Sequence, residues 1–410
     1  MSADRSTDFV VVGSGPGAAV TAATLRRHGK AVIRVGSAFT HPERPLGAGW
    51  CAEAPPTGFE VAAAPRRALL VRGSLLALPL SGADRVRLLP ARALPKAGVA
   101  LGRARVASAI AAFVGGGREE RSYRDWVQHR FGAPIYEAVY APYARARFGD
   151  PETLLCGIAR VVHGEPPAAG SRAPAGLHDA HPDDIDSVVT GLGEGRVETE
   201  AGTIEGRIVV DLAPDEVVRL HGDARLALDA AGLHARHGLE VWVRGTLPEG
   251  VDEIHVAGNS TGGPPFFRAV QHAARPGEVA LHLAVEPGSP PWTSEAPRLA
   301  QELVDAAAGL GLKGLDPAGA VVRWLPRHHA VWTTGHLTRL RTWTEALVDG
   351  GIEPVGRVGL VAPMSSAAIA AYAEDRLIHG ASLRDCIRHH VEPAPRDSVA
   401  RPRLADFVTR

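Results

Sequence analysis

Gly13, Gly15 and Ala18 form the pattern G-x-G-x-x-A, with Gly17 as a further glycine inside it. An apolar run at 9–12 precedes the pattern, a segment of helical composition at 18–27 follows it, and a second apolar run occupies 31–35. Glycines permit a tight turn and close backbone approach, and a helix N-terminus offers amides and a positive dipole to a pyrophosphate. We therefore predict a dinucleotide-binding loop in a βαβ unit.

The end of the second predicted strand departs from that pattern. A dinucleotide-binding unit normally has an acidic residue there, whose carboxylate accepts hydrogen bonds from the ribose hydroxyls. Gly36 stands at this position. One contact to an adenosine ribose is therefore predicted to be missing.

His328 and His329 are the candidates for proton transfer, because histidine titrates nearest to neutral pH. They qualify if they face a cavity, and a pair on the surface is the alternative. No His-x-x-x-His or Cys-x-x-Cys spacing indicates a metal site, and we predict none. The pattern Gly-x-Ser-x-Gly is absent, so hydrolysis by an activated serine has no support.

Composition narrows the class of protein. The chain has 410 residues, enough for two or three structural units, and equal numbers of basic and acidic residues, 45 each. Zero net charge gives no general attraction to nucleic acid, which we exclude as a partner. The first residues lack the pattern of a signal peptide, and no apolar run is long enough to span a bilayer. We expect a soluble cytoplasmic protein with a small-molecule substrate; a homo-oligomer or a protein partner remains open.

The remaining periodicities predict a sheet-rich middle and a helical insertion. Aromatic residues at helical spacing between 123 and 148 indicate a helical cap, and the change to a period of two at 187–211 indicates a β-meander. Further elements are a hairpin at 67–80, strands at 239–243, 254–258, 266–272, 279–285 and 358–362, and helices at 296–310 and 366–379.

Together these elements predict an α/β protein with a dinucleotide-binding βαβ unit, a sheet-based substrate domain and a helical cap. The substrate domain is 51–110 with 226–349, the cap is 111–165, and 391–410 is a tail.

One block of the predicted cap carries a family resemblance. Tyr123-Arg124-Asp125-Trp126, Phe131-Gly132, Tyr136-Glu137-Ala138, Pro142-Tyr143, Phe148-Gly149 and Pro151-Glu152 keep their order and spacing. The block resembles the helical segment of the protoporphyrinogen oxidase, amine oxidase and UDP-galactopyranose mutase superfamily of flavoproteins. The hairpin that begins at Arg72 and the segment 321–332 are similar to family segments as well. The resemblance implies FAD as the cofactor. It also implies a discontinuous Rossmann-type FAD/NAD(P)-binding domain, which we assign to 1–50, 187–225 and 350–390.

The resemblance also implies site residues. It assigns Arg323, His328, His329 and Trp332 to the wall of the substrate cavity, and Arg72 to substrate binding. Tyr143 and Arg145 follow the family-like Pro142 and could orient an anionic or sugar-like substrate, with core packing as the alternative. Besides Gly13, Gly15, Gly17, Ala18 and Gly36, the cofactor contacts fall on Gly47, Pro363 and Met364.

Several of these cofactor positions depart from the family pattern. Pro363-Met364 stands where the family has Gly-Asp or Gly-Arg, and Gly47-Ala48-Gly49 is a weakened form of its Gly-Gly-Arg-like turn. Proline donates no amide hydrogen bond. We therefore expect FAD to be bound weakly or lost, and expect Gly36→Glu to raise its occupancy if the cavity keeps the shape of a flavin.

Three functions remain open at this point. The first is an FAD-dependent oxidoreductase acting on a small organic substrate. The second is a redox-neutral, flavin-dependent mutase or isomerase acting on a nucleotide sugar. The third is a flavin-free member of the fold with a non-redox, cyclase- or isomerase-type activity, or a structural partner role.

Overall fold

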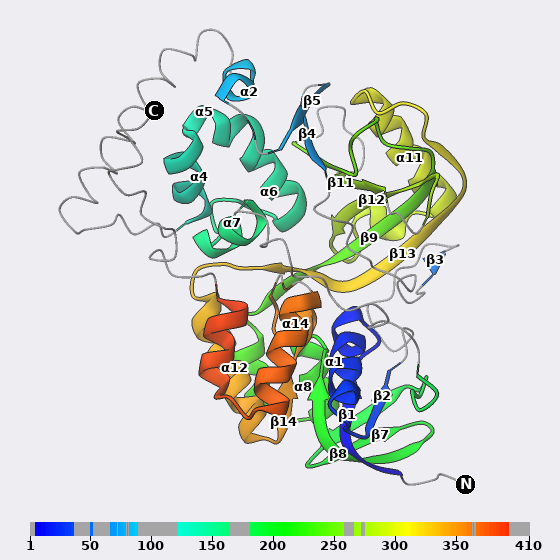
Figure 1. Ribbon diagram of the computed structural model, residues 1–410, viewed down its shortest axis with the longest axis vertical. Helices are drawn as coiled ribbons and strands as arrows, with labels where there is room; N and C mark the ends of the chain where they lie inside the picture. Colours follow the sequence, from blue (N-terminus) through cyan, green and yellow to red (C-terminus); the bar gives the residue numbers. More distant parts are fainter. Residues whose placement is uncertain are drawn as a thin grey trace, which may run out of the picture.

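The computed structural model describes residues 5–36, 50–51, 66–71, 73–78, 80, 82–88, 122–163, 181–257, 266–271, 275–362, 364 and 366–392. Two sheets dominate it, the first in the lower half of Figure 1 and the second in the upper half, with a group of helices beside the upper sheet. This arrangement confirms the predicted α/β class.

The lower sheet contains the predicted βαβ unit. Strands β1 (Arg5–Val12) and β2 (Val32–Val35) are parallel and are joined by helix α1 (Pro16–Arg27). β1 also pairs in parallel with β8 (Gly202–Val210), which in turn pairs in parallel with β14 (Ile352–Pro354). The C-terminal residues of β1 and β8 are apolar and buried, as expected where helices cover a parallel sheet. The meander strands β6 (Val189–Gly193) and β7 (Arg196–Thr199) extend the sheet in antiparallel fashion.

The prediction of a strand at 358–362 is wrong. The C-terminal strand that pairs with β8 is β14, and the chain after β14 forms the short helix α13 (Gly356–Gly359). Gly356 has a φ of +74°, which turns the chain out of the sheet at this point. The apolar residues 358–362 are buried because they pack within the core, and a short apolar run does not distinguish a strand from a buried helix.

The upper sheet runs in the order β3-β13-β9-β12-β11-β10-β4-β5. Its strands are β3 (Trp50–Cys51), β4 (Arg67–Val71), β5 (Ser74–Ala77), β9 (His234–Arg244), β10 (Glu253–Val256), β11 (Phe266–Gln271), β12 (Glu278–Val285) and β13 (Asp316–Val331). One face packs against helix α11 (Ala296–Gly309) through apolar residues such as Leu281 and Leu303. Alternate residues of the same strands therefore point to the opposite face, toward the rest of the molecule.

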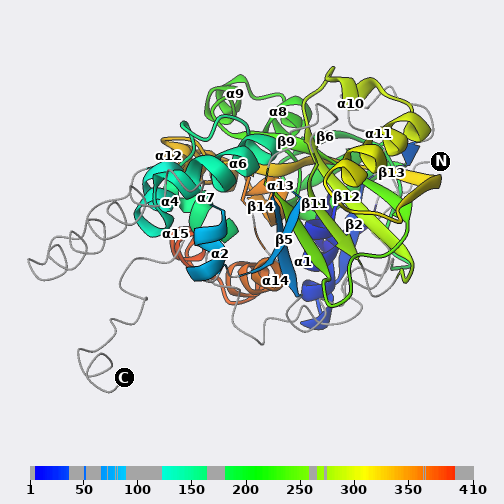
Figure 2. The same ribbon diagram turned by 90° about the horizontal axis from the view of Figure 1, so that it is seen from above.

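The predicted helical cap covers part of that opposite face. Its elements are α4 (Tyr123–Phe131), α5 (Ala133–Ile135), the π-helical turn η2 (Tyr136–Tyr140), α6 (Ala141–Phe148) and α7 (Cys156–His163). Ser122 caps α4 by accepting a hydrogen bond from the amide of Asp125. Helix α6 contacts β11, β12 and β13, and Figure 2 shows the cap helices gathered beside the upper sheet.

The other helices belong to both halves of the molecule. They are α2 (Gly82–Arg87), α8 (Pro214–His221), α9 (Ala224–Ala230), α10 (Pro290–Thr293), α12 (His336–Asp349), α14 (Ser366–Ala373), η3 (Glu374–Ile378), α15 (Leu383–Cys386) and η4 (Ile387–Val391). Helix α14 packs against α1, so the C-terminal region completes the layer that the N-terminal region begins. Among the described helices, none combines the length and apolar character needed to cross a bilayer.

Candidate functional site

The glycine loop, residues 13–18, holds the side chain of Asp211. This residue follows β8, and its carboxylate is buried at the N-termini of two helices. Oδ2 accepts a hydrogen bond from the amide of Ala18 at 3.0 Å. Oδ1 accepts from the amides of Val358 at 3.1 Å and Gly359 at 3.2 Å. One amide of the predicted pyrophosphate loop, that of Ala18, and two amides of α13 are thus bonded to a carboxylate of the chain itself.

The position of the same carboxylate explains why two nearby residues are glycines. A Cβ on Gly17 would lie 2.2 Å from Asp211 Oδ2, and one on Gly356 would lie 2.4 Å from Oδ1. Either distance is far inside van der Waals contact. Burial raises the pKa of Asp211, while the three amides and the Arg357 guanidinium oppose that rise.

Gly36, at the end of β2, lies against the first residues of the glycine loop. A Cβ at this position would lie 2.9 Å from the carbonyl carbon of Gly13 and 3.1 Å from the amide nitrogen of Ser14. The Gly36 amide donates to the carbonyl of Ile185, whose own amide donates to Arg34. The expected gain in FAD from Gly36→Glu therefore does not hold, because the described backbone leaves no room for a side chain at Gly36.

Three predicted contacts, Arg72, Gly47 and Pro363, lie outside the described residues. Met364 is described, and it is buried with its carbonyl accepting a hydrogen bond from Arg357 Nε. The described part of the loop does not fit the pyrophosphate of a dinucleotide, because the buried Asp211 carboxylate lies against Gly15 and Gly17 and accepts a hydrogen bond from the Ala18 amide. No reaction step is assigned to such a cofactor.

The polar face of the upper sheet carries the second cluster. His255, Arg268, His282, Glu240 and Arg323 lie on five adjacent strands, and each is the direct cross-strand partner of the next. We call these five residues the polar row. Directly paired residues have Cβ atoms about 5 Å apart, so the row is one continuous strip of polar side chains across the sheet.

The middle of the row is a buried ion pair. Arg323 Nη2 lies 2.5 Å from Glu240 Oε2, and both side chains are almost fully buried. His282 Nδ1 lies 3.6 Å from Glu240 Oε1 on the other side. Burial raises the pKa of Glu240, and the charges of Arg323 and Arg268 oppose that rise. Arg323, predicted as a substrate contact, thus lies on the face of the sheet opposite helix α11, with its charge already partnered.

A hydrogen-bonded chain leads from the row into the cap. Glu253 Oε1 lies 2.8 Å from His255 Nε2 and 2.7 Å from Arg268 Nε. Although burial alone would raise it, Arg268 and His255 hold the pKa of Glu253 well below its usual range. The ionised carboxylate of Glu253 accepts a hydrogen bond from the Nε2–H group of His255. The Nδ1 atom of the neutral His255 then accepts a hydrogen bond from the Tyr143 hydroxyl, 3.2 Å away.

The guanidinium beside Tyr143 belongs to Arg147. Its Nη1 donates to the Tyr143 hydroxyl at 3.0 Å. The predicted partner, Arg145, is exposed to solvent instead. Residues four apart share a helix face and residues two apart do not, so the pairing of Tyr143 with Arg145 is corrected to Arg147.

A bulge in β13 positions the histidine pair. Between Leu325 and His329 this strand has two more residues than its partner β9, and Arg327 adopts a φ of +47° there. An even insertion keeps His329 on the same face as Arg323. Gly238 on β9 makes the room, since a Cβ there would lie 3.2 Å from His329 Nε2. The two imidazole rings are 4.9 Å apart between centroids.

Four arginines act on His328. Burial is the main cause that lowers its pKa well below the usual value, followed by the charges of Arg357, Arg147, Arg323 and Arg268. Burial also lowers the pKa of Arg357 to about 10, with Arg268 and Arg147 adding to the effect. His328 is therefore a neutral imidazole at neutral pH in a positive surrounding. His328, Arg147 and Arg357 are only half-buried, so a ligand can reach them.

Trp332 has a different environment from the one predicted. It is fully buried, stacks on His336 and donates its indole N–H to the carbonyl of Val361 at 2.8 Å. These contacts join the end of β13 to the segment after α13. The structure thus brings His328, His329, Arg323 and Tyr143 toward one region and places Trp332 in the adjoining core.

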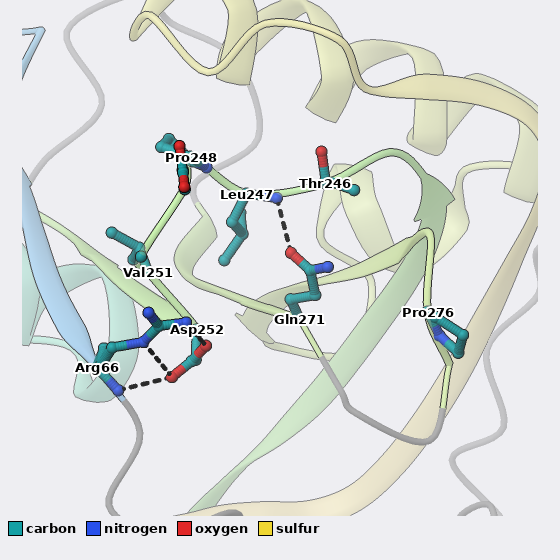
Figure 3. A pocket seen from close by; sticks show the side chains of 10 residues that line it. Arg66, Thr246, Leu247, Pro248, Val251, Asp252, Gln271 and Pro276 are labelled. Carbon is teal, nitrogen blue, oxygen red and sulfur yellow. Dashed lines mark hydrogen bonds and ion pairs between the residues drawn. The ribbon is translucent and has the colours of Figure 1, made fainter.

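A surface hollow of about 350 Å³ lies elsewhere, at the turn before β10 (Figure 3). Its lining includes Leu247, Val251 and Gln271, and the ion pair between Arg66 and Asp252. That pair neutralises its own charges, and the lining contains no residue of the polar row. We place the candidate site at the row.

Comparison with known proteins agrees with the fold. No family model and no curated protein matches the sequence. A solved structure of reduced UDP-galactopyranose mutase is similar, with a TM-score of 0.66, 13% identity, and 93% of this chain and 98% of that chain covered. A protoporphyrinogen oxidase from Exiguobacterium sp. 255-15 gives 0.57 and 15%, covering 91% and 99%. A fatty acid isomerase from P. acnes gives 0.55 and 11%, covering 91% and 98%. The resemblance predicted from the sequence is confirmed at the level of the fold.

Proposed function

We propose that this chain is an enzyme of the flavoprotein fold that binds a small anionic molecule over the polar row and acts on it by redox-neutral proton transfer. The observation that carries the proposal is the polar row on one face of the sheet, joined to Arg147 of the cap through Tyr143 and His255. The charges of Arg357, Arg147, Arg323 and Arg268 act together on the neutral His328. Arginines in a desolvated site bind carboxylate and phosphate groups in preference to neutral ones.

The roles follow from position. The half-buried Arg147 and Arg357 bind the anionic group, and the buried Arg323 and the half-buried Arg268 add positive potential from the sheet. His328 is the base, because a neutral imidazole can accept a proton. An anion bound nearby would raise the pKa of His328 by offsetting the arginine charges, so the base becomes stronger only when substrate is present.

The reaction class that this arrangement supports is proton abstraction and return on a substrate bearing a carboxylate or phosphate. Positive charge fixed around the reacting atoms stabilises the anionic intermediate of such a reaction. Two of the structural neighbours are named as a mutase and an isomerase, and enzymes of both classes catalyse rearrangements without net oxidation or reduction of the substrate. The carboxylate in the glycine loop supports a reaction without FAD at that loop.

Calorimetric titration with citrate, inorganic phosphate and UDP tests the proposal. We expect at least one of these anions to bind with proton uptake, seen as an enthalpy that depends on the ionisation enthalpy of the buffer. Arg147→Met should weaken binding by roughly tenfold, the value of one charge-assisted hydrogen bond. Arg145→Met is the matched control on the same helix and should leave binding unchanged, because Arg145 is exposed.

Two results would contradict the proposal. One is that none of the three anions binds; the other is that the two arginine variants weaken binding equally. Loss of proton uptake in His328→Asn, with anion binding retained, would assign the proton to this histidine.

The second candidate is a flavin-dependent oxidoreductase or nucleotide-sugar mutase. The glycine loop within a βαβ unit favours it, and so does the similarity to the mutase. The absorbance spectrum of the purified protein separates the two candidates. Flavin bands at stoichiometric strength would favour the second.

A further inference from the structure

One amide of the glycine loop and two amides of α13 converge on one side chain. Donors from the start of α1 and the start of α13 meet at the two oxygens of Asp211, within 3.0 to 3.2 Å. A phosphoryl group bound at such a loop accepts hydrogen bonds from backbone amides in the same way. The carboxylate supplies both the negative charge and the acceptors that a phosphoryl group would supply.

The glycines of the loop serve the carboxylate directly. The Asp211 oxygens lie where side chains on Gly17 and Gly356 would begin, and the carbonyl of Asp211 lies 3.0 Å from the Cβ position of Gly13. The dinucleotide pattern of the sequence is thus fully used by a contact within the protein. Arg357 adds positive charge near the same oxygens.

We infer that Asp211 is a built-in anion that occupies a phosphoryl-binding site, and that the site exists in latent form beneath it. Removing the carboxylate uncovers three amides and the charge of Arg357 without altering any glycine. The chemical class of ligand for the uncovered site is a phosphoryl group, free or as part of a nucleotide. This inference does not depend on which molecule binds at the polar row.

The test compares wild type, Asp211→Ala and Asp211→Asn by calorimetry and thermal unfolding, with inorganic pyrophosphate and ADP as separate probes. Asp211→Ala opens the space. Asp211→Asn fills it without the charge, and its amide N–H opposes the amide of Ala18. We expect Asp211→Ala to bind pyrophosphate at least about tenfold more tightly than the other two proteins, since each charge-assisted hydrogen bond has roughly that value.

The probes identify the form of the ligand. Binding of both pyrophosphate and ADP shows that a nucleotide fits, and binding of pyrophosphate alone shows that only the phosphoryl group does. Both results support the inference. Equal binding by Asp211→Ala and Asp211→Asn would overturn it, because the space would then not matter.

Wild type provides an independent test if Asp211→Ala folds poorly. Saturable binding of ADP by wild type, abolished by Gly15→Val in a folded protein, would show that the loop already accepts phosphate and would overturn the inference. Where Asp211→Ala is destabilised, a larger rise in its melting temperature with pyrophosphate than wild type shows supports the inference, because a ligand that binds only the folded state stabilises it and binding at the polar row is common to both proteins. No rise in a folded Asp211→Ala protein would contradict it.

Discussion

The glycine loop and the polar row are both built from buried charges, but they differ in how those charges are satisfied. At the loop, the oxygens of Asp211 have backbone donors fixed by two helices. At the row, Arg323 and Arg268 are paired with the carboxylates of other side chains, Glu240 and Glu253. The comparison teaches that a conspicuous sequence pattern can be satisfied by backbone amides, while an inconspicuous set of single polar residues forms the site at which we propose that an anion binds.

The largest expected effect comes from breaking the ion pair of the row. Glu240→Ala removes the carboxylate from the buried Arg323 and should lower the free energy of unfolding by about 3 to 5 kcal/mol. Urea denaturation measures this loss. The double variant Glu240→Met with Arg323→Met should recover most of it, since an apolar pair requires no charge compensation. A double variant as unstable as the single one would show that packing, and not charge, dominates the row.

The next effect tests the loop. Gly17→Ala places a methyl group 2.2 Å from Asp211 Oδ2 and should destabilise the fold by about 3 kcal/mol. Gly15→Ala is the matched control, because its Cβ would lie 3.4 Å from the same oxygen. In an Asp211→Ala background the cost of Gly17→Ala should largely vanish. Additive effects in this double-mutant cycle would separate Gly17 from the carboxylate.

A smaller effect contrasts Asp211 with a second buried carboxylate, Glu216 on α8. Burial raises the pKa of Glu216 to about 7 from an ordinary 4.5, with Asp215 adding repulsion. Because the folded-state pKa is the higher one, the protonated form favours folding. Its contribution is fully present below pH 4.5 and is lost as the pH rises through about 7. Stability should therefore fall by roughly 2 kcal/mol between about pH 5 and pH 8.

Glu216→Gln should remove that part of the pH dependence, measured by urea denaturation at both pH values. Asp211→Asn provides the comparison and should leave the change near pH 7 in place. If Glu216→Gln preserves the full dependence, another group is responsible.

The smallest effect concerns the chain of hydrogen bonds between the row and the cap. Tyr143→Phe removes the hydroxyl that joins Arg147 to His255 and should cost about 1 kcal/mol of stability. The titration of His255, followed by NMR, should shift as well because the hydrogen bond at Nδ1 is lost. A variant with unchanged stability and an unchanged His255 titration would remove this chain from the site.

Much of the fold was predictable because its periodicities are strong. The βαβ unit, the meander and the strands from 239 to 285 all have clear apolar patterns, and each is present. The strand at 358–362 failed because a buried segment looks the same whether it is extended or helical. The length of β13 was also missed, since its polar residues at 327–329 interrupt the apolar pattern.

The candidate site was predicted only in part. His328 and His329 were found from their chemistry, but Arg147 was missed in favour of Arg145, a choice that helix periodicity could have corrected. The polar row has a sequence signal in retrospect, because Arg268, Glu240 and His282 each interrupt an apolar strand. Their alignment depends on the register of five strands, which no local pattern encodes. Asp211 could be seen at the end of an apolar run, but its partners are nearly 150 residues away or more.

Strand β13 carries Arg323 and the histidine pair and leads directly to Trp332, whose indole holds the carbonyl of Val361 beyond α13. Val361 adopts a φ of +42°, which is costly for a β-branched residue and shows how firmly this junction is held. The spacing between the row and α13 is therefore set by strand β13 and by the buried hydrogen bond from the indole at its end. A fixed spacing of this kind would make the proposed site select anions by length as well as by charge.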